Sequence, residues 1–435
     1  MNNTGVDFLY AIFLQHRNIQ TDTRKLQKGD IFFALKGENF DANAFAEQAL
    51  DRGAAYAVID DAQYQKGDRY LLVENVLHTL QQLAAWHRQK TNAKILAITG
   101  TNGKTTTKEI IAAVLGKEYR IIYTEGNLNN HIGVPLTLLR IQEDTEIAVI
   151  EMGANHIGEI ASYCEWAKPD YGIITNVGKA HLEGFGSLEG VQQAKGELYR
   201  SIAGQGKLIF QYKDAPFLHE MTPEHVSVMT YGSSNADICG KVADTSSVTL
   251  NVEITYPEDI AGSYPSRLVG SYNLPNILCA ITVGMFFNIG TEHIRAAIQE
   301  YTPSNSRSQL LKKGTNTIIM DAYNANPTSL ALALENLSRL TSESKWVLIG
   351  AMKEMGSNSD AEHAHIVDLA RKLGLDQLLL VGQEFEKAGI QDTPIFSTSE
   401  ELREYLLRHP IENATILIKG SRGSKMEAVL PAFEH

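Results

Sequence analysis

The residues best suited to chemistry in this chain are Gly103-Lys104-Thr105, which stand between two contrasting patterns. An apolar, β-branched run at residues 95–99 leads into a turn rich in Gly, Thr and Asn, and a helical pattern follows from about residue 110. A helix start leaves backbone N–H groups free and carries a partial positive charge, so it can bind an anion. Lysine can reach terminal phosphates there, and a threonine hydroxyl can ligate Mg²⁺. The pattern favours a nucleoside triphosphate site over the alternative, a strand-to-helix turn with an incidental lysine.

Further along the chain, three more residues could contribute to such a site. Glu151 directly follows the apolar run at residues 147–150. Ligands of open α/β sheets bind at the carboxyl ends of strands, so Glu151 is placed to hold Mg²⁺ near the phosphates. A solvated acid at a strand end is the alternative. His181 could ligate a metal or be a structural or surface histidine, and Lys195, taken alone, is a solvated helix residue.

The elements that must position these residues belong to a large protein of ordinary composition. A chain of 435 residues exceeds the usual size of one domain, so two or three are expected. With 43% hydrophobic and 21% charged residues it can bury large cores. The net charge of −12 argues against a broad nucleic-acid footprint, which needs a basic face. Local basic residues can still bind anionic substrates.

The three cysteines and the hydropathy pattern indicate a cellular compartment. Cys164, Cys239 and Cys279 are widely spaced and odd in number, which is typical of reduced thiols and not of a disulfide framework or zinc site. The first residues lack a basic segment followed by an apolar core, and no stretch approaches the length of a membrane span. We therefore expect a cytoplasmic protein without membrane insertion.

Strand-like and helical runs alternate almost throughout, which predicts parallel sheets covered by helices. Residues 248–255 differ, because apolar and polar side chains alternate there as in an antiparallel strand with one buried face. Breaks near residues 91–92 and 303–306 predict three domains, at 1–90, 91–305 and 306–435. The expected fold class is α/β: a small N-terminal α/β domain, a central P-loop domain with a parallel sheet, and a C-terminal doubly wound, Rossmann-like domain.

Several longer motifs resemble, in order, those of the Mur ligases. They are Thr99-Gly-Thr-Asn-Gly-Lys-Thr105, Gly126-Asn-Leu-Asn-Asn-His-Ile-Gly-Val-Pro135, Glu151-Met-Gly-Ala-Asn155, Ala180-His-Leu-Glu-Gly-Phe-Gly-Ser187, Ala194-Lys-Gly-Glu197, Asn273-Leu-Pro-Asn276, Arg307 and Asp321-Ala-Tyr-Asn-Ala-Asn-Pro327. The resemblance spans essentially the whole chain. Within the family it is greatest to the branch that joins D-alanyl-D-alanine to a UDP-N-acetylmuramoyl-tripeptide.

The resemblance implies a role for each domain and a reaction. The N-terminal domain would bind the UDP substrate, the central domain would bind ATP, and the C-terminal domain would close over ATP and bind the dipeptide. The γ-phosphoryl group of ATP would pass to the tripeptide carboxylate and give an acyl phosphate. The amine of D-alanyl-D-alanine would then displace phosphate and form a UDP-linked pentapeptide, a precursor of peptidoglycan. A monomer using ATP and two Mg²⁺ ions is expected.

The resemblance also implies which residues bind the nucleotide. They are Gly100, Thr101, Asn102, Gly103, Lys104, Thr105, Thr106, Asn276, Arg307, Asp321, Tyr323, Asn324 and Asn326. Lys104 would hold the β- and γ-phosphates, Asn276 would contact adenine, and Asp321 would bind the ribose. Arg307 would reach the phosphates as the C-terminal domain closes.

Metal binding and catalysis are implied for an overlapping set. Thr105 and Glu151 would coordinate the first Mg²⁺. His181 and a Lys195 carbamoylated by CO₂, with Glu151 nearby, would hold the second. A free ammonium at Lys195 would repel Mg²⁺, whereas a carbamate inverts the charge and supplies oxygen atoms. The catalytic residues would be Lys104, Asn130, His181, Lys195 and Arg307.

For the other substrates, the resemblance implies contacts in all three domains. Asn127 and Asn130 would orient the acyl or phosphoryl groups. Thr23, Arg24 and Asn43 lie in segments similar to a uridine-nucleotide signature and offer donors for a diphosphate or uracil, although a turn into a strand is the alternative. Lys419, Ser421 and Arg422 could meet the carboxylate of the dipeptide, or could belong to a solvated strand-to-helix turn.

Three other interpretations fit the residues less well. A sibling ligase that adds the third amino acid carries an Asp-Asn-Pro-Arg signature, which this chain lacks. Folate-polyglutamate ligases usually continue the phosphate loop as Gly-Lys-Gly-Ser, unlike Gly103-Lys-Thr-Thr106. A nucleotide-binding module without turnover would not need second-metal ligands, so the joint presence of Lys104, Glu151, His181 and Lys195 counts against it.

Overall fold

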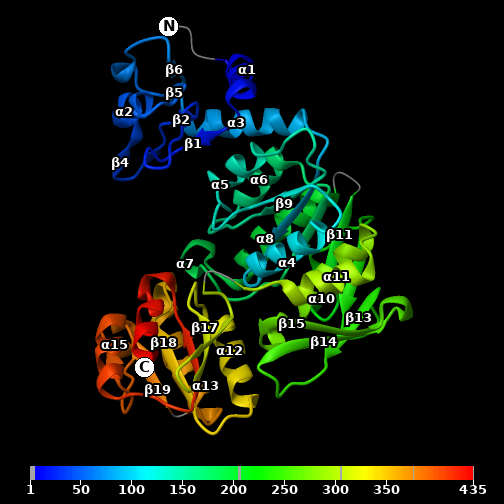
Figure 1. The fold of residues 1–435 in the computed structure, drawn as a ribbon, viewed down its shortest axis with the longest axis vertical. Coiled ribbons are helices and arrows are strands. Elements are labelled where there is room, and N and C mark those ends of the chain that lie inside the picture. Colours follow the sequence, from blue (N-terminus) through cyan, green and yellow to red (C-terminus); the bar gives the residue numbers. More distant parts are fainter. Residues whose placement is uncertain (1–4, 204–206, 304–305, 376, 435) are drawn as a thin grey trace.

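The computed structural model describes residues 5–203, 207–303, 306–375 and 377–434. Three main sheets follow one another along the chain, with the N-terminal sheet at one end of the molecule and the C-terminal sheet at the other (Figure 1). This arrangement confirms the expected three-part α/β fold. The predicted second boundary includes residues 304–305, which lie outside the described residues.

The N-terminal sheet has four parallel strands in the order β1-β2-β5-β6. These are β1 (Ile19–Gln20), β2 (Ile31–Phe33), β5 (Tyr56–Ile59) and β6 (Tyr70–Leu72), and a separate hairpin is formed by β3 (Lys36–Gly37) and β4 (Phe40–Asp41). The helices are α1 (Val6–His16), α2 (Ala46–Asp51) and α3 (Val76–Gln89). Helix α3 packs on α1 and also on helices of the central unit, so it joins the two parts (Figure 1).

The central sheet has nine strands in the order β15-β14-β13-β12-β11-β10-β7-β9-β8. They are β7 (Lys94–Thr99), β8 (Ile121–Tyr123), β9 (Ile147–Glu151), β10 (Tyr171–Ile174), β11 (Leu208–Tyr212), β12 (Ser227–Gly232), β13 (Ile238–Val242), β14 (Thr249–Tyr256) and β15 (Gly262–Val269). The strands from β8 to β13 are parallel, and β14 pairs antiparallel with both neighbours, as the alternating pattern at 248–255 predicts. Strand β7 lies between β9 and β10, so three strand ends that bear site residues meet at one edge.

Helices cover both faces of the central sheet. One layer contains α4 (Lys104–Leu115), α10 (Leu274–Phe286) and α11 (Thr291–Glu300), and the other contains α5 (Gly133–Leu138), α6 (Glu159–Ala167) and α8 (Leu188–Ala203); short helices α7 (Leu182–Phe185) and α9 (Pro216–Glu220) complete the unit. Ile95 and Ala97 of β7 pack into one layer and Leu96 and Ile98 into the other. Burial on both faces explains why the strand is continuously apolar.

The C-terminal sheet has six strands in the order β16-β17-β21-β18-β19-β20. They are β16 (Gln309–Lys313), β17 (Asn316–Asp321), β18 (Lys345–Gly350), β19 (Leu378–Val381), β20 (Ile395–Phe396) and β21 (Thr415–Lys419), all parallel except β16. Helices α12 (Pro327–Arg339) and α13 (Ser359–Lys372) cover one face, and α15 (Ser399–Arg408) with a 3₁₀ segment (Met426–Phe433) covers the other. Helix α14 (Gln383–Lys387) precedes β20. The doubly wound unit is thus confirmed, with an added antiparallel edge strand.

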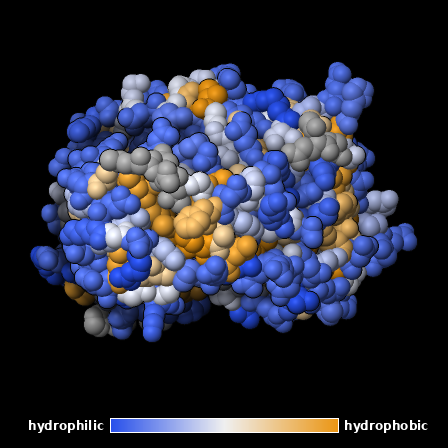
Figure 2. Space-filling model, turned by 90° about the horizontal axis from the view of Figure 1, so that it is seen from above, coloured by the Kyte–Doolittle hydropathy of each residue, from blue (hydrophilic) through white to orange (hydrophobic). Residues whose placement is uncertain are grey.

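The surface seen from the N-terminal side is mostly hydrophilic, with apolar side chains gathered toward the middle of the face (Figure 2). In the parts of the chain that the structure describes, no helix combines the length and apolar character needed to cross a bilayer. Cys164, Cys239 and Cys279 are buried free thiols. Burial raises the pKa of both Cys164 and Cys279 to about 12.

Candidate active site

A cavity of about 600 Å³ opens between the carboxyl edge of the central sheet and the C-terminal unit. The predicted site residues that line it are Thr101, Asn102, Gly103, Lys104, Thr105, Thr106, Asn127, Asn130, Glu151, His181, Asn276, Arg307, Asp321, Tyr323, Asn324, Asn326, Lys419 and Arg422. Motifs that lie far apart in the sequence, from Thr101 to Arg422, therefore meet around one space. Their joint position is the expected one for strand ends of parallel sheets.

Three predicted residues lie close to this cavity without lining it. Gly100 is in the phosphate loop with φ +141°, and a Cβ there would come within 2.0 Å of the Thr175 hydroxyl, so only glycine fits. Lys195 is buried in α8. Ser421 is also buried, and its hydroxyl accepts a hydrogen bond from the backbone N–H of Lys353 at 3.0 Å.

The predicted uridine-binding residues lie in the N-terminal unit. Arg24 is exposed and forms an ion pair with Asp22 at 2.8 Å, and Thr23 is half-buried. Asn43 is buried, and its amide donates to Asp41 and Asp60 and accepts from the Asp60 backbone N–H. Asn43 thus organises its own loop, and the uridine contacts of all three residues stay a prediction.

The phosphate loop is held in place by the end of the neighbouring strand β10. The backbone N–H of Thr101 donates to the Asn176 carbonyl at 3.0 Å, and that of Asn102 donates to the Asn176 side chain at 2.9 Å. The Thr175 hydroxyl donates to the Asn102 carbonyl at 2.6 Å. These contacts fix the conformation of the loop, which is what an anion-binding turn requires.

Lys104 begins helix α4 and folds back over the loop. Its ammonium donates to the carbonyls of Gly100 at 2.6 Å and Thr101 at 3.1 Å. Desolvation lowers the pKa of Lys104, an effect that Glu151 opposes and Arg307 reinforces. The hydrogen bonds that the structure gives the ammonium go to neutral carbonyl oxygens, so incoming phosphate oxygens offer it a better partner.

Glu151 is buried at the end of β9, where its carboxylate has several partners. It accepts hydrogen bonds from the Thr105 hydroxyl at 2.9 and 3.1 Å and from the Asn129 amide at 2.7 Å. The ammonium of Lys108 lies 3.4 Å away. Lys108 is completely buried, and among the described residues its Nζ has no hydrogen-bond partner.

His181 precedes α7 and lies at the boundary with the C-terminal unit. Its Nδ1 forms an ion-pair contact with Glu354, and its ring meets Phe185 edge-on. Desolvation lowers the pKa of His181, against the effect of Glu354. Nζ of Lys195 lies 5.4 Å from the centre of the same Phe185 ring. Burial, followed by the charge of Lys104, lowers the pKa of Lys195 to about 7, so much of its amine is neutral near pH 7.

The donor atoms fit one Mg²⁺ better than two. Within the described ranges, no three His, Cys, Asp or Glu side chains gather into a group that could hold a metal ion. Nucleotide-bound Mg²⁺ needs only one or two protein oxygens, since phosphates and waters supply the others. The hydroxyl of Thr105 beside the carboxylate of Glu151 meets that need. His181 and an unmodified Lys195 offer only nitrogen, so a second ion would require an added oxygen donor.

The predicted nucleotide residues beyond the phosphate loop line the cavity from both the central and the C-terminal unit. The Arg307 guanidinium lies 3.6 Å from the centre of the Tyr323 ring, and that of Arg422 lies 5.7 Å from the same ring. Asn276 is buried, accepts from the Thr107 hydroxyl at 3.0 Å and donates to Asn273 at 2.8 Å. A second amide, that of Asn326, donates across the cavity to Asn102 at 2.8 Å while its oxygen caps helix α12.

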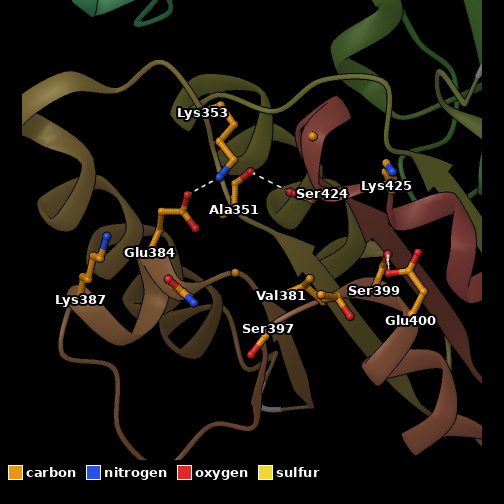
Figure 3. Close-up of a pocket in the computed structure, with 14 residues that line it drawn as sticks. Ala351, Lys353, Val381, Glu384, Lys387, Ser397, Ser399, Glu400, Ser424 and Lys425 are labelled. Atoms are coloured by element: carbon orange, nitrogen blue, oxygen red, sulfur yellow. Dashed lines mark hydrogen bonds and ion pairs between the residues drawn. The ribbon is translucent and has the colours of Figure 1, made fainter.

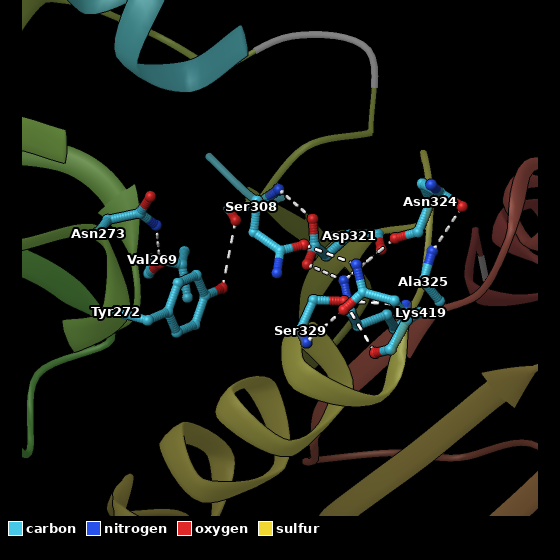
Figure 4. A network of polar contacts seen from close by, with 11 residues as sticks. Val269, Tyr272, Asn273, Ser308, Asp321, Asn324, Ala325, Ser329 and Lys419 are labelled. Carbon is cyan, nitrogen blue, oxygen red and sulfur yellow. Dashed lines mark hydrogen bonds and ion pairs between the residues drawn. The ribbon is translucent and has the colours of Figure 1, made fainter. Parts of the chain in front are cut away.

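Asp321 is the centre of a polar network at the ends of β17 and β21 (Figure 4). Its carboxylate accepts from the backbone N–H of Ser308 at 3.1 Å and from the Lys419 ammonium at 2.5 Å. Lys419 is buried and also donates to the Asn324 carbonyl at 3.3 Å. Lys419, which is predicted to contact the dipeptide, is therefore paired with Asp321, which is predicted to bind the ribose.

The cavity has further polar lining residues that sequence reasoning did not select. They include Asn129, Asn155, His156, Glu159, Asn176, Tyr272, Asn273, Ser308 and Glu354. Asn176 follows strand β10 as Glu151 follows β9, and that position could have identified it. Lys108 lies one helical turn after Lys104, a spacing that puts both on one face. Glu354 lies in Gly350-Ala-Met-Lys-Glu-Met-Gly356, a segment that also resembles the family, but no sequence signal assigns it a role.

A second cavity, of about 360 Å³, lies at the carboxyl ends of β18, β19, β20 and β21 (Figure 3). No predicted site residue lines it. Lys353 pairs with Glu384, and the Ser424 hydroxyl donates to the Ala351 carbonyl at 3.2 Å. The Ser399 hydroxyl donates to Glu400 at 3.2 Å. Some of its polar groups thus satisfy one another.

Stability should depend on pH through His363, which supports the loop that carries Glu354. The buried ring accepts a hydrogen bond from the Met352 backbone N–H at 3.0 Å and donates to the Ser359 carbonyl at 2.7 Å. Desolvation lowers the pKa of His363 below its usual 6.5. The unfolded chain therefore binds a proton first, and this part of the stability is lost as pH falls below about 6.5.

We expect His363→Gln to flatten the pH dependence of the free energy of unfolding between pH 7 and 5 by up to about 1.4 kcal/mol per pH unit. Urea unfolding at several pH values measures this. The matched control is His225→Gln, since the His225 side chain is 95% exposed. Equal slopes for wild type and His363→Gln would contradict the prediction.

The chain is similar to known proteins in sequence and in structure. Three family models match in succession: "Mur ligase family, catalytic domain" at residues 15–89, "Mur ligase middle domain" at 98–284 and "Mur ligase, glutamate ligase domain" at 306–422. UDP-N-acetylmuramoyl-tripeptide–D-alanyl-D-alanine ligase of Bacillus subtilis is 33% identical, covering 95% of this chain and 92% of the relative. The Escherichia coli enzyme of that name is 34% identical, covering 96% and 93%.

Solved structures of MurF also align with nearly the whole chain. A crystal structure of MurF from Acinetobacter baumannii aligns with a TM-score of 0.85 and 31% identity, covering 96% of this chain and 93% of that one. MurF ligase from Thermotoga maritima in complex with ADP aligns with a TM-score of 0.84 and 28% identity, covering 97% and 98%.

Proposed function

Because this chain belongs to the Mur ligase family, we propose that it joins D-alanyl-D-alanine to UDP-N-acetylmuramoyl-tripeptide and forms ADP and phosphate. The relatives that carry this name cover nearly the whole chain. The single observation that carries the proposal is the cavity, where the phosphate loop, Glu151 and the C-terminal Asp321 network face one another. The product is the UDP-linked pentapeptide used in peptidoglycan synthesis.

We assign one ligand to each part of the chain. Residues 1–90 bind the UDP moiety, 91–305 bind ATP, and 306–435 close over ATP and receive the dipeptide. The contacts Asn326–Asn102 and Lys179–Glu362, the latter at 2.7 Å, support a closed arrangement of the last two parts. The unpaired thiols and the use of ATP support a cytoplasmic location.

In this mechanism the protein's main task is to bring anions together and neutralise them. Lys104 moves from the loop carbonyls to the β- and γ-phosphates, and Arg307 leaves the Tyr323 ring for the same group. Asn127 and Asn130 orient the tripeptide carboxylate toward the γ-phosphorus. The carboxylate oxygen attacks, ADP leaves, and the acyl phosphate is then attacked by the dipeptide amine with loss of phosphate. Mg²⁺ at Thr105 and Glu151 would neutralise charge on the phosphate oxygens.

A carbamate on Lys195 would supply the oxygens that a second Mg²⁺ requires beside His181. Two observations support this modification. A pKa of about 7 leaves a neutral amine able to react with CO₂, and the described residues give Nζ no hydrogen bond that would restrain it. The product is an anion, so it also places a buried negative charge close to the ammonium of Lys104.

Lys419 is expected to act on the nucleotide through Asp321. Replacing it with methionine should raise the KM for ATP about tenfold, because one orienting interaction of about 1.4 kcal/mol is lost. The KM for D-alanyl-D-alanine should stay within about twofold. Steady-state kinetics on Lys419→Met and on the exposed Lys425→Met measures both constants. A selective rise in the dipeptide KM would instead support the direct contact predicted from the sequence.

The function itself is tested by phosphate release from ATP in the presence of UDP-N-acetylmuramoyl-tripeptide, with and without D-alanyl-D-alanine, together with product masses. Phosphate release that depends on the dipeptide, with the mass of the UDP-pentapeptide, is the expected result. Turnover with a free amino acid and a shorter UDP-peptide would identify a sibling ligase. Absence of turnover with every acceptor would support a nucleotide-binding module.

A further inference from the structure

The contact between His181 and Glu354 joins the two units that form the nucleotide cavity, and the mechanism above does not use the glutamate. Both side chains line the cavity. Nδ1 of His181 pairs with a carboxylate oxygen of Glu354. His181 belongs to the central unit, whereas Glu354 lies in the loop after β18 of the C-terminal unit. Helix α7, which His181 precedes, lies beside that C-terminal unit (Figure 1).

The backbone at both residues is unusual. His181 has φ +50° and Glu354 has φ +63°, the left-handed region that non-glycine residues seldom adopt. Such conformations cost free energy and are kept where the surrounding structure or a function requires them. Here the two strained residues meet each other across the boundary of the cavity. Both ends of this one contact therefore lie at left-handed backbone positions.

A hydrogen bond from one ring nitrogen to a carboxylate determines which nitrogen of the imidazole can bind a ligand. When Nδ1–H donates to Glu354, the tautomer is fixed and the lone pair of Nε2 is left for a ligand. Among the described residues, His181 has no other hydrogen bond to its ring; Phe185 contacts it only edge-on, with ring centres 6.4 Å apart. In the part of the chain that the structure describes, the central unit therefore gives the ring no hydrogen bond that fixes its orientation. Glu354 supplies the missing restraint.

We propose that Glu354 is a positioning residue that orients His181 toward the cation at the nucleotide phosphates, and does so only when the C-terminal unit is seated. This inference rests on the proposed function. It makes completion of the cation site depend on the position of the C-terminal unit. ATP would then be activated only in the closed enzyme, where the dipeptide is also held.

The neighbouring pair Lys179–Glu362 provides a matched control. It also crosses between the two units, at 2.7 Å, and it does not touch the His181 ring. Glu362→Gln therefore removes one contact between the units and leaves Glu354, the partner of the imidazole, in place. Glu354→Ala removes the orienting carboxylate. Glu354→Gly removes it as well and tolerates φ +63°, so loss of folding cannot explain an effect shared by both Glu354 variants.

The test measures binding of Mn²⁺, as a spectroscopic substitute for Mg²⁺, to the full chain with a non-hydrolysable ATP analogue and the UDP-tripeptide. Electron paramagnetic resonance of free Mn²⁺ gives the affinity without turnover. Both Glu354 variants should bind Mn²⁺ about 10- to 100-fold more weakly than wild type, the usual cost of losing a partner of a ligating histidine. Glu362→Gln should stay within about twofold of wild type. The Mg²⁺ concentration for half-maximal ligase activity should shift in parallel.

Two results would overturn the inference. One is unchanged Mn²⁺ affinity in both Glu354 variants, and the other is an equal loss in Glu362→Gln, which would indicate general seating of the domain. Failure of the proposed function is seen separately, as a wild-type protein that forms no UDP-pentapeptide. The Mn²⁺ titration still decides the role of Glu354 in that case, because it requires no reaction.

Discussion

Replacing Lys104 with methionine is expected to lower kcat/KM for ATP by about 10³-fold or more. The ammonium is the charge that the phosphate loop itself brings to the β- and γ-phosphates, and its present partners are two carbonyl oxygens that a phosphate displaces. Methionine keeps the unbranched shape and removes the charge. Phosphate release under saturating UDP-tripeptide and dipeptide measures the effect.

The same substitution should not lower the melting temperature. Desolvation disfavours the charged form of Lys104, so a neutral side chain of similar shape relieves that cost. A large loss of activity without a loss of stability would separate a catalytic effect from misfolding. Lys117→Met serves as the control, since this lysine lies just beyond α4 and pairs with Glu300 on the surface. Retention of more than a tenth of the activity by Lys104→Met would contradict the assignment.

Lys195→Ala is expected to lose activity by at least about a hundredfold and to regain part of it when acetate or propionate is added. Truncation leaves a space in a buried position of α8, and a small carboxylic acid can bring back the oxygen atoms that the carbamate is proposed to supply. Ligase activity as a function of added acid gives the measurement. The wild-type enzyme should show no such activation.

Lys195→Met distinguishes rescue from a general effect of the acids. It removes the amine while still filling the space, so it should be inactive and should not respond to acetate. A fully active Lys195→Ala would exclude the carbamate, and equal activation of the alanine and methionine variants would exclude a specific carboxylate site.

The parts of the site that the sequence predicted are those whose geometry follows from one strand and the turn after it. The continuous apolar run of β7, the glycine turn and the start of α4 are contiguous, and Glu151 directly follows β9. The rule that ligands bind at the carboxyl ends of parallel strands then brings them together without knowledge of strand order. The alternating pattern at 248–255 was sufficient to predict the antiparallel strand β14 for a similar reason. Such a pattern arises within a single strand that has one buried face.

The contacts that sequence reasoning missed depend on which strands and domains become neighbours. Lys419 and Asp321 are 98 residues apart and meet because β17 and β21 pair in that register. Glu354 reaches His181 only through the docking of two units. Asn43, predicted to bind the uridine nucleotide, is buried among Asp41 and Asp60, which composition alone does not reveal. Residue type limits what a side chain can do, and its neighbours select among those possibilities.

Because the native thiols are buried, dyes attached to introduced cysteines can report domain movement by fluorescence. Thiol reagents attack the thiolate, and Cys164 and Cys279, with a pKa of about 12, carry almost none at neutral pH. Cys239 is shielded by burial. Cysteines introduced at the exposed Phe8 and Leu407 would therefore take up a donor and an acceptor dye while the native cysteines stay unlabelled. Energy transfer between the first and last domains could then be followed in single molecules during turnover, in an otherwise unaltered protein.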